Sequence, residues 1–167
     1  MSANDKVQAT PVKVLFVCTG NICRSPTAEG VFRAMVDATR LSGRIAADSA
    51  GIANYHIGEP PDERSQAAAL ARGIDLSGQC GRQVTQGDFR DFDYVVAMDR
   101  THQEELLHLC PPDRTHRVKL LLDYAPQAGT KDVPDPYYGH HDGFNHVLNL
   151  IEAGAAGLLQ EIRGILK

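Results

Sequence analysis

The sequence predicts an α/β fold in which a mostly parallel, four-stranded sheet carries helices on both faces. Short runs rich in β-branched and aromatic residues alternate along the chain with longer segments of helical periodicity. Strands that alternate with helices in this way form parallel sheets. The 167 residues are 43% hydrophobic and 23% charged, and they contain no repeat, low-complexity tract or linker, which is typical of a single domain.

The first strand and the first helix enclose a short polar loop. The run "VKVLFVC", Val12–Cys18, suits a buried strand, and "TGNICR" follows it. The pair Ser25-Pro26 predicts a helix start, with serine as the N-cap and proline in the first turn. The apolar face of this helix is formed by residues at helical spacing, namely Ala28, Val31, Phe32, Met35 and Thr39.

The rest of the chain continues the alternation. Three further strands are predicted at Arg44–Gly51, Tyr94–Met98 and Val118–Tyr124. Three further helices are predicted at Asp62–Arg72, Thr101–Leu109 and about Asp142–Leu166. Gly73 stands where a glycine commonly ends a helix. We therefore expect residues 1–11 to form a flexible tail and residues 12–167 to form the domain.

Composition and charge limit the partners of the chain. No apolar run reaches the roughly 18 residues that a membrane helix needs, so we expect no membrane association. The net charge of −4 and the single short basic cluster, residues 114–119, argue against nucleic acid. The polar N-terminal segment lacks the apolar core of a secretory signal, so a cytoplasmic protein is expected. We also expect a monomer. The four cysteines are then reduced thiols, with Cys80 and Cys110 in structural positions.

The loop after the first strand has the features of an anion site. Cys18 ends that strand, at the edge of a parallel sheet where ligands bind. The following helix N-terminus offers unpaired N–H groups to a phosphate, and Arg24 adds a planar pair of donors. The same positive field favours the thiolate form of Cys18, which is the nucleophilic form. On position alone, however, a cysteine that ends a buried strand is more often a small core residue.

Four motifs resemble the low-molecular-weight protein tyrosine phosphatase family. "VCTGNICRSPTAEG" looks like the family's phosphate-binding loop, and "VPDPYYG" looks like its acid loop. "DSAGIANYHIGEPPDERS" and "YVVAMD" are similar to two further segments of the family. The resemblance covers about residues 12–165 in order, and three or more separated motifs are far more specific than one. It implies a phosphatase domain at residues 12–167.

The resemblance also implies a catalytic set. Cys18 would be the nucleophile, Arg24 would bind the phosphate and Asp135 would be the general acid. These types agree with the chemistry, because displacing a tyrosine oxygen from phosphorus requires a nucleophile, stabilisation of the phosphoryl oxygens and a proton for the leaving group. The substrate would be a phosphotyrosine-containing protein, the intermediate a cysteinyl phosphate and the product inorganic phosphate. No cofactor or metal is implied.

Further residues receive roles through the same resemblance. Asn21 and Ser49 would hold the strained loop in shape, and Ser25 would donate its hydroxyl to the thiolate. Cys23 would form a reversible disulfide with an oxidised Cys18. The residues implied to bind the substrate are Thr19, Gly20, Asn21, Ile22, Cys23, Ser25, Tyr55, Tyr137 and Tyr138. The family often has tryptophan where Tyr55 stands, and this chain has no tryptophan, which leaves the substrate preference open.

Three other functions are weighed against this one. Arsenate reductases of this fold use a further pair of nearby cysteines, whereas here Cys80 stands alone in that region and Cys110 follows 30 residues later. Protein-arginine phosphatases of this fold carry threonine where this chain has Ile22, so Ile22 favours an aryl substrate. A phosphotyrosine-binding module without turnover would be expected to lack Cys18 or Asp135.

Two other candidate sites are interpreted as having no metal-binding or catalytic role. His140, His141 and Asp142 are residue types that bind metals, but their spacing matches no common ligand motif, so a surface position is expected. Asp99 ends a predicted strand and is an alternative catalytic carboxylate. We interpret it instead as a group that orients its neighbours and place it outside the site.

Overall fold

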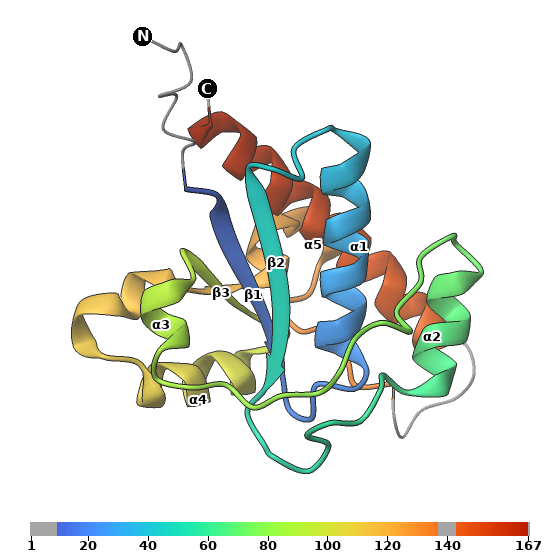
Figure 1. Ribbon diagram of the computed structural model, residues 1–167, viewed down its shortest axis with the longest axis horizontal. Helices are drawn as coiled ribbons and strands as arrows, with labels where there is room; N and C mark the ends of the chain where they lie inside the picture. The colour runs from blue at the N-terminus through green and yellow to red at the C-terminus, as the bar shows by residue number, and fades with distance from the viewer. Residues whose placement is uncertain (1–9, 137–142, 167) are drawn as a thin grey trace, which may run out of the picture.

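In a computed structural model that describes residues 10–136 and 143–166, the strands form one parallel sheet (Figure 1). Every neighbouring pair runs parallel, in the order β2-β1-β3-β4. The predicted fold class is therefore confirmed. The strands are β1 (Val12–Cys18), β2 (Ile45–Gly51), β3 (Tyr94–Ala97) and β4 (Val118–Leu120).

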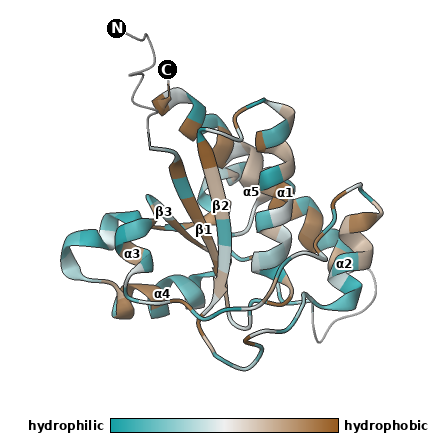
Figure 2. Cartoon of the chain, in the orientation of Figure 1, coloured by the Kyte–Doolittle hydropathy of each residue, from teal (hydrophilic) through white to brown (hydrophobic). Residues whose placement is uncertain are grey.

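Helices cover both faces of this sheet. The long helices α1 (Arg24–Ala38) and α5 (Gly143–Ile165) lie on one face, and α3 (Asp88–Asp91) and α4 (Arg100–Leu109) lie on the other (Figure 1). The short helix α2 (Glu63–Leu70) packs beside α1 and α5. In Figure 2 the hydrophobic colouring is concentrated on the central strands, between these helical layers.

The alternation of side chains along β1 explains why two helical layers are needed. Val14 and Phe16 belong to the apolar core beneath α1 and α5, whereas Leu15 and Val17 belong to the core beneath α3 and α4. All four side chains are fully buried. A strand that is buried on both faces has no polar alternation, which is why "VKVLFVC" reads as an almost continuous apolar run.

The predicted start of α1 is wrong. The helix begins at Arg24, and Cys23 occupies the N-cap without a side-chain cap, so Ser25 is not the capping residue. Its hydroxyl points into the preceding loop, where it lies against Cys18 and Asn21. The hydroxyl therefore serves the loop instead of the helix end.

The predicted fourth strand is too long. β4 ends at Leu120, and Leu121–Tyr124 forms a 3₁₀ helix. Leu121 and Leu122 both belong to the core beneath α1 and α5, whereas consecutive residues of a strand would face opposite sides of the sheet. The turn packs against α5 at Gly154, where a Cβ atom would lie 2.6 Å from Leu121 Cγ.

The other boundaries differ by one or two residues. The strand predicted from Arg44 begins at Ile45, β3 ends at Ala97 rather than Met98, and α4 begins at Arg100 rather than Thr101. Helix α2 ends at Leu70, and Gly73 adopts a φ of 80° just beyond it, donating its N–H to Leu70 O. The short helices α3, Pro112–Arg117 and Pro126–Ala128 were not predicted.

Some predictions concern residues that lie beyond the described part. Most of the predicted tail, residues 1–9, is outside it, and so is Asp142 at the start of the last predicted helix. Among residues 10–136 and 143–166, no helix combines the length and the apolar composition that a membrane crossing requires.

Candidate active site

The loop that follows β1 lies at the point where the sheet reverses its winding order. The chain passes from β1 through α1 to β2 on one side, and it returns to β3 on the other side of β1. Ligands of open parallel sheets bind at this reversal, beyond the carboxyl ends of the strands. A cleft opens there, lined by Cys18, Thr19, Gly20, Ile22, Cys23, Arg24, Tyr55, His56 and Asp135.

A buried chain of hydrogen bonds holds the nucleophile candidate. Cys18 Sγ lies 2.9 Å from Ser25 Oγ, and Asn21 Nδ2 donates to Ser25 Oγ at 2.9 Å. The backbone N–H of Arg82 donates to Asn21 Oδ1 at 3.0 Å, which fixes the orientation of the amide. Because Ser25 Oγ accepts from Asn21, its own hydrogen is available to Cys18, and the alternative acceptor Ala50 O is 3.4 Å away. The sulfur therefore has a hydroxyl donor directed at it.

The same chain continues to a carboxylate that the sequence reasoning missed. Asn21 Nδ2 also donates to Ser49 Oγ at 2.9 Å, and Ser49 Oγ donates to Glu29 Oε1 at 2.9 Å. Glu29 is only 6% exposed, and burial raises the pKa of its carboxyl. Its other oxygen lies 3.0 Å from Arg33 Nε. A glutamate one turn before an arginine was the available signal, but the pair resembles an ordinary surface pair in sequence.

Asn21 takes a backbone conformation that is unusual for a side chain with a Cβ atom. Its φ is 59°, in the left-handed region, where asparagine is tolerated better than most residues. Gly51, opposite it on β2, allows the loop to approach closely, because a Cβ atom there would lie 2.9 Å from Thr19 O. The loop is therefore bent around Cys18 by one strained asparagine and one close glycine.

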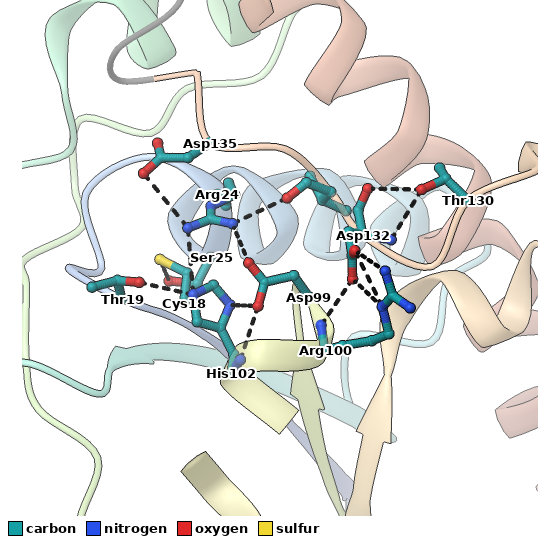
Figure 3. A network of polar contacts seen from close by, with 11 residues as sticks. Cys18, Thr19, Arg24, Ser25, Asp99, Arg100, His102, Thr130, Asp132 and Asp135 are labelled. Atoms are coloured by element: carbon teal, nitrogen blue, oxygen red, sulfur yellow. Dashed lines mark hydrogen bonds and ion pairs between the residues drawn. The ribbon is translucent and has the colours of Figure 1, made fainter. Parts of the chain in front are cut away.

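Arg24 is fixed from the other side of the cleft (Figure 3). Its side chain is 6% exposed, and Nη1 donates to Asp99 Oδ2 at 2.8 Å and to Val133 O at 3.0 Å. Asp99 also caps α4, because its Oδ1 accepts from the His102 backbone N–H at 2.8 Å. The carboxylate thus orients Arg24, in agreement with its interpretation as an orienting group.

Asp135 comes to the same cleft from a distant part of the chain. Its Oδ2 lies 3.6 Å from Arg24 Nη2, and its side chain is 39% exposed. Pro134 and Pro136 flank it and restrict the backbone on both sides. The structure therefore brings Cys18, Arg24 and Asp135 together at one opening, with Asp135 at the solvent side.

An exposed aromatic side chain lines the cleft. Tyr55 is 74% exposed. His56, which the sequence reasoning missed, lines the cleft, and its Nδ1 lies 2.6 Å from Glu59 Oε2. Tyr137 and Tyr138, the other predicted walls, lie outside the described residues.

The remaining cysteines differ in their surroundings. Cys23 is buried beside the cleft, and burial raises its pKa to about 12, so it stays a thiol. Cys80 is exposed and Cys110 is buried, and neither lines the cleft. Within the described residues no group of three or more His, Cys, Asp or Glu is placed to hold a metal ion. His140, His141 and Asp142 fall outside that part of the chain.

Comparison with known proteins gives one consistent result. Residues 13–165 match the family described as low molecular weight phosphotyrosine protein phosphatase. The low molecular weight protein-tyrosine-phosphatase YfkJ of Bacillus subtilis is 45% identical over 152 residues, which covers 91% of this chain and 96% of the relative. A crystal structure of a protein tyrosine phosphatase from Entamoeba histolytica, with Hepes in the active site, superimposes with a TM-score of 0.90 at 36% identity. That match covers 93% of this chain and 99% of the other.

A second solved structure bears on substrate choice. It is a Drosophila arginine phosphatase, and it superimposes with a TM-score of 0.84 at 34% identity, covering 90% of this chain and 98% of the other. Proteins with differently described substrates thus share this fold.

Proposed function

This chain belongs to the low molecular weight phosphotyrosine protein phosphatase family, and we propose that it hydrolyses phosphotyrosine in protein substrates through a cysteinyl-phosphate intermediate. The observation that carries the proposal is the meeting of three groups in one cleft. A cysteine that receives a hydroxyl hydrogen bond, a buried arginine and a partly exposed carboxylate line the same opening.

Phosphate binding is assigned to the loop between β1 and α1. The first turn of α1 presents backbone N–H groups and the positive end of the helix dipole. Arg24 adds a guanidinium whose orientation is fixed by Asp99 and Val133 O. A dianion bound there would sit against Cys18 with its charge stabilised before the reaction begins.

In the first step, Cys18 Sγ attacks phosphorus while the bond from phosphorus to the phenolic oxygen breaks. Asp135 gives its proton to that oxygen, so tyrosine leaves as a neutral phenol. The sulfur now carries the phosphoryl group, and Asp135 is a carboxylate. A general acid must reach a bulky leaving group, and the solvent-side position of Asp135 suits this task.

In the second step, a water molecule attacks the phosphoryl group of the cysteinyl phosphate. Asp135 takes a proton from this water, the bond between sulfur and phosphorus breaks, and inorganic phosphate and the Cys18 thiolate are released. Ser25 Oγ, 2.9 Å from the sulfur, stabilises the thiolate as a leaving group by the same hydrogen bond that stabilises it as a nucleophile. Every group returns to its starting state.

The walls of the cleft support an aryl substrate. Ile22 and Tyr55 line it and offer apolar contact to a phenyl ring. A phosphotyrosine side chain is long enough to carry its phosphate to the bottom of such a cleft, whereas phosphoserine is shorter. A reduced thiol is required throughout, so a cytoplasmic site of action is part of the proposal.

The test is steady-state hydrolysis of matched peptides that carry phosphotyrosine, phosphoserine or phosphoarginine, with arsenate reduction measured alongside. We expect kcat/KM to be highest for phosphotyrosine and unchanged by EDTA. The Cys18→Ser variant is the control for contaminating activity. A higher kcat/KM for phosphoarginine would overturn the substrate assignment, and thiol-dependent reduction of arsenate would overturn the reaction class.

A further inference from the structure

We propose that His102 is a positioning residue for this site: a neutral imidazole that accepts a hydrogen bond from the Thr19 hydroxyl and lies against the Arg24 guanidinium. The inference rests on the proposed function for its kinetic consequences, but the state of the imidazole can be tested in the free protein. His102 was not singled out in the sequence, because histidine in an amphipathic helix is usually unremarkable.

The geometry of His102 connects three parts of the site (Figure 3). The residue lies in the first turn of α4 and is 2% exposed. Its Nε2 lies 2.8 Å from Thr19 Oγ1 and 3.4 Å from Arg24 Nη2. Its Nδ1 lies 3.2 Å from Asp99 Oδ1, although the alignment is too poor for a hydrogen bond. The ring therefore fills the space between the loop after β1 and the cap of α4.

These neighbours select one tautomer of the imidazole. Arg24 Nη2 can only donate, so a hydrogen on His102 Nε2 would place two donors against each other. Nδ1 faces a carboxylate oxygen, which favours a hydrogen there. The favoured form is thus protonated on Nδ1 and has its lone pair on Nε2. The Thr19 hydroxyl must then be the donor in the 2.8 Å contact.

The ring also stays neutral in the folded protein. Burial, and next the charge of Arg24, lower the pKa of His102 to about 4, against the opposing effect of Asp99, Asp135 and Asp132. A second proton would place an imidazolium directly against the guanidinium. The positive charge of Arg24 is therefore left for the substrate, and His102 contributes a lone pair instead of a competing charge.

This arrangement has a consequence for the phosphate loop. Thr19 follows the nucleophile directly, and its side chain is drawn toward α4 by the bond to Nε2. Removing the imidazole would leave the Thr19 hydroxyl without this acceptor and would remove the ring against which Arg24 Nη2 rests. Both changes loosen the groups that hold a phosphate in the ground state and in the transition state.

The kinetic test compares His102→Leu with His102→Gln. Glutamine can place an amide oxygen near the position of Nε2 and so accept from Thr19, whereas leucine fills the space without an acceptor. We expect kcat/KM to fall by roughly 10- to 100-fold in His102→Leu, the range expected for a buried hydrogen bond that is lost. Competitive inhibition by inorganic phosphate should weaken in parallel. His102→Gln should recover most of both values.

A double-mutant comparison isolates the proposed contact. Thr19→Val removes the hydroxyl at nearly constant volume, and its effect should largely disappear in the His102→Leu background. Fully additive effects on kcat/KM would overturn the proposal, and so would wild-type kcat/KM and phosphate inhibition in His102→Leu. Thermal unfolding of each variant shows whether a loss reflects the site or the fold.

The structural test needs no substrate. Nitrogen NMR of labelled wild-type protein should show His102 neutral, with its hydrogen on Nδ1, from about pH 5 upward, because its pKa is about 4. A hydrogen on Nε2, or titration near the ordinary pKa of histidine, would contradict the inference. If wild-type protein hydrolyses no phosphotyrosine, the proposed function fails, while NMR and phosphate binding still decide the role of His102.

Discussion

Two groups of residues support the cleft through different kinds of contact. One group, which we call the loop network, consists of Asn21, Ser25, Ser49 and Glu29, and all four side chains are buried. The other, which we call the charged side, consists of Arg24, Asp99, His102 and Asp135. It runs from a fully covered imidazole to a carboxylate whose side chain is 39% exposed.

This difference indicates that the two groups have separate tasks, one in positioning the Cys18 sulfur and the other in phosphate binding and proton transfer. The loop network fixes where the Cys18 sulfur lies and which donor it receives, and neither task requires a group to move. In the proposed mechanism the charged side meets a dianion and passes a proton, and its position at the solvent side of the cleft suits both tasks. We expect substitutions in the loop network to change the reactivity of the thiol, and substitutions on the charged side to change phosphate binding and proton transfer.

Removing the Cys18 sulfur, which both groups of residues surround, should have the largest effect on activity. Cys18→Ser replaces the thiolate with a hydroxyl that stays protonated, so turnover of phosphotyrosine peptides should be abolished. Titration calorimetry should still detect inorganic phosphate binding, because the loop amides and Arg24 remain. Hydrolysis near the wild-type rate would show that Cys18 is not the nucleophile.

Removing the proposed proton donor of the charged side should have the next largest effect. Asp135→Asn should slow hydrolysis of tyrosine phosphate by roughly 10²- to 10⁴-fold, the usual contribution of a positioned acid. An ester of a much more acidic phenol needs less protonation, so the loss in its first step, followed by rapid mixing, should be smaller. Equal losses for both esters would assign the acid to another residue, and Asp99 would be the next to test.

A smaller effect is expected from the loop network. Ser49→Ala leaves Asn21 and the carboxylate of Glu29 without their shared partner, so unfolding free energy should fall by about 1–3 kcal/mol, as for a buried group left unpaired. The rate constant for alkylation of Cys18 by iodoacetamide should also fall, because the loop that directs Ser25 at the sulfur is loosened. Unchanged stability and unchanged alkylation would separate Ser49 and Glu29 from the nucleophile.

The smallest effect on the untreated enzyme is expected at Cys23. Peroxide should oxidise Cys18 to a sulfenic acid, which condenses with the Cys23 thiol to a disulfide and water. A dithiol reductant should then restore activity. In Cys23→Ser a larger share of the lost activity should be permanent, measured relative to each protein's own untreated rate. Equal recovery in both proteins would remove Cys23 from this role.

Features formed by consecutive residues could be predicted better than features formed by residues that meet only in the fold. The segment from Val12 through the first helix could be predicted because strand, loop and helix follow one another within a few residues. Ser25 was misplaced as a cap because its hydroxyl bonds to a thiol and an amide that only the folded loop brings near. Glu29 and His102 were missed for the same reason, since their partners lie 20 and 83 residues away.

Residue spacing alone could not identify the distant carboxylate or the residues that support the loop. Asp135 and Ser49 were assigned from the resemblance of whole motifs, because no periodic pattern connects either residue with Cys18. The end of β4 was beyond pattern reasoning, since it depends on α5 offering Gly154 to Leu121. Local chemistry thus predicts the nucleophile loop, whereas the acid and the second layer of support depend on tertiary packing.

The most direct test of the account is to observe the phosphoryl group on the proposed nucleophile. Asp135→Asn mixed with an activated aryl phosphate should accumulate the intermediate, because asparagine cannot act as the base in the second step. Rapid acid quenching followed by peptide mass spectrometry should then find one phosphoryl group on Cys18, formed at the rate at which the phenol is released. A burst of phenol with no phosphoryl group on Cys18, or with the group on another residue, would contradict the cysteinyl-phosphate mechanism.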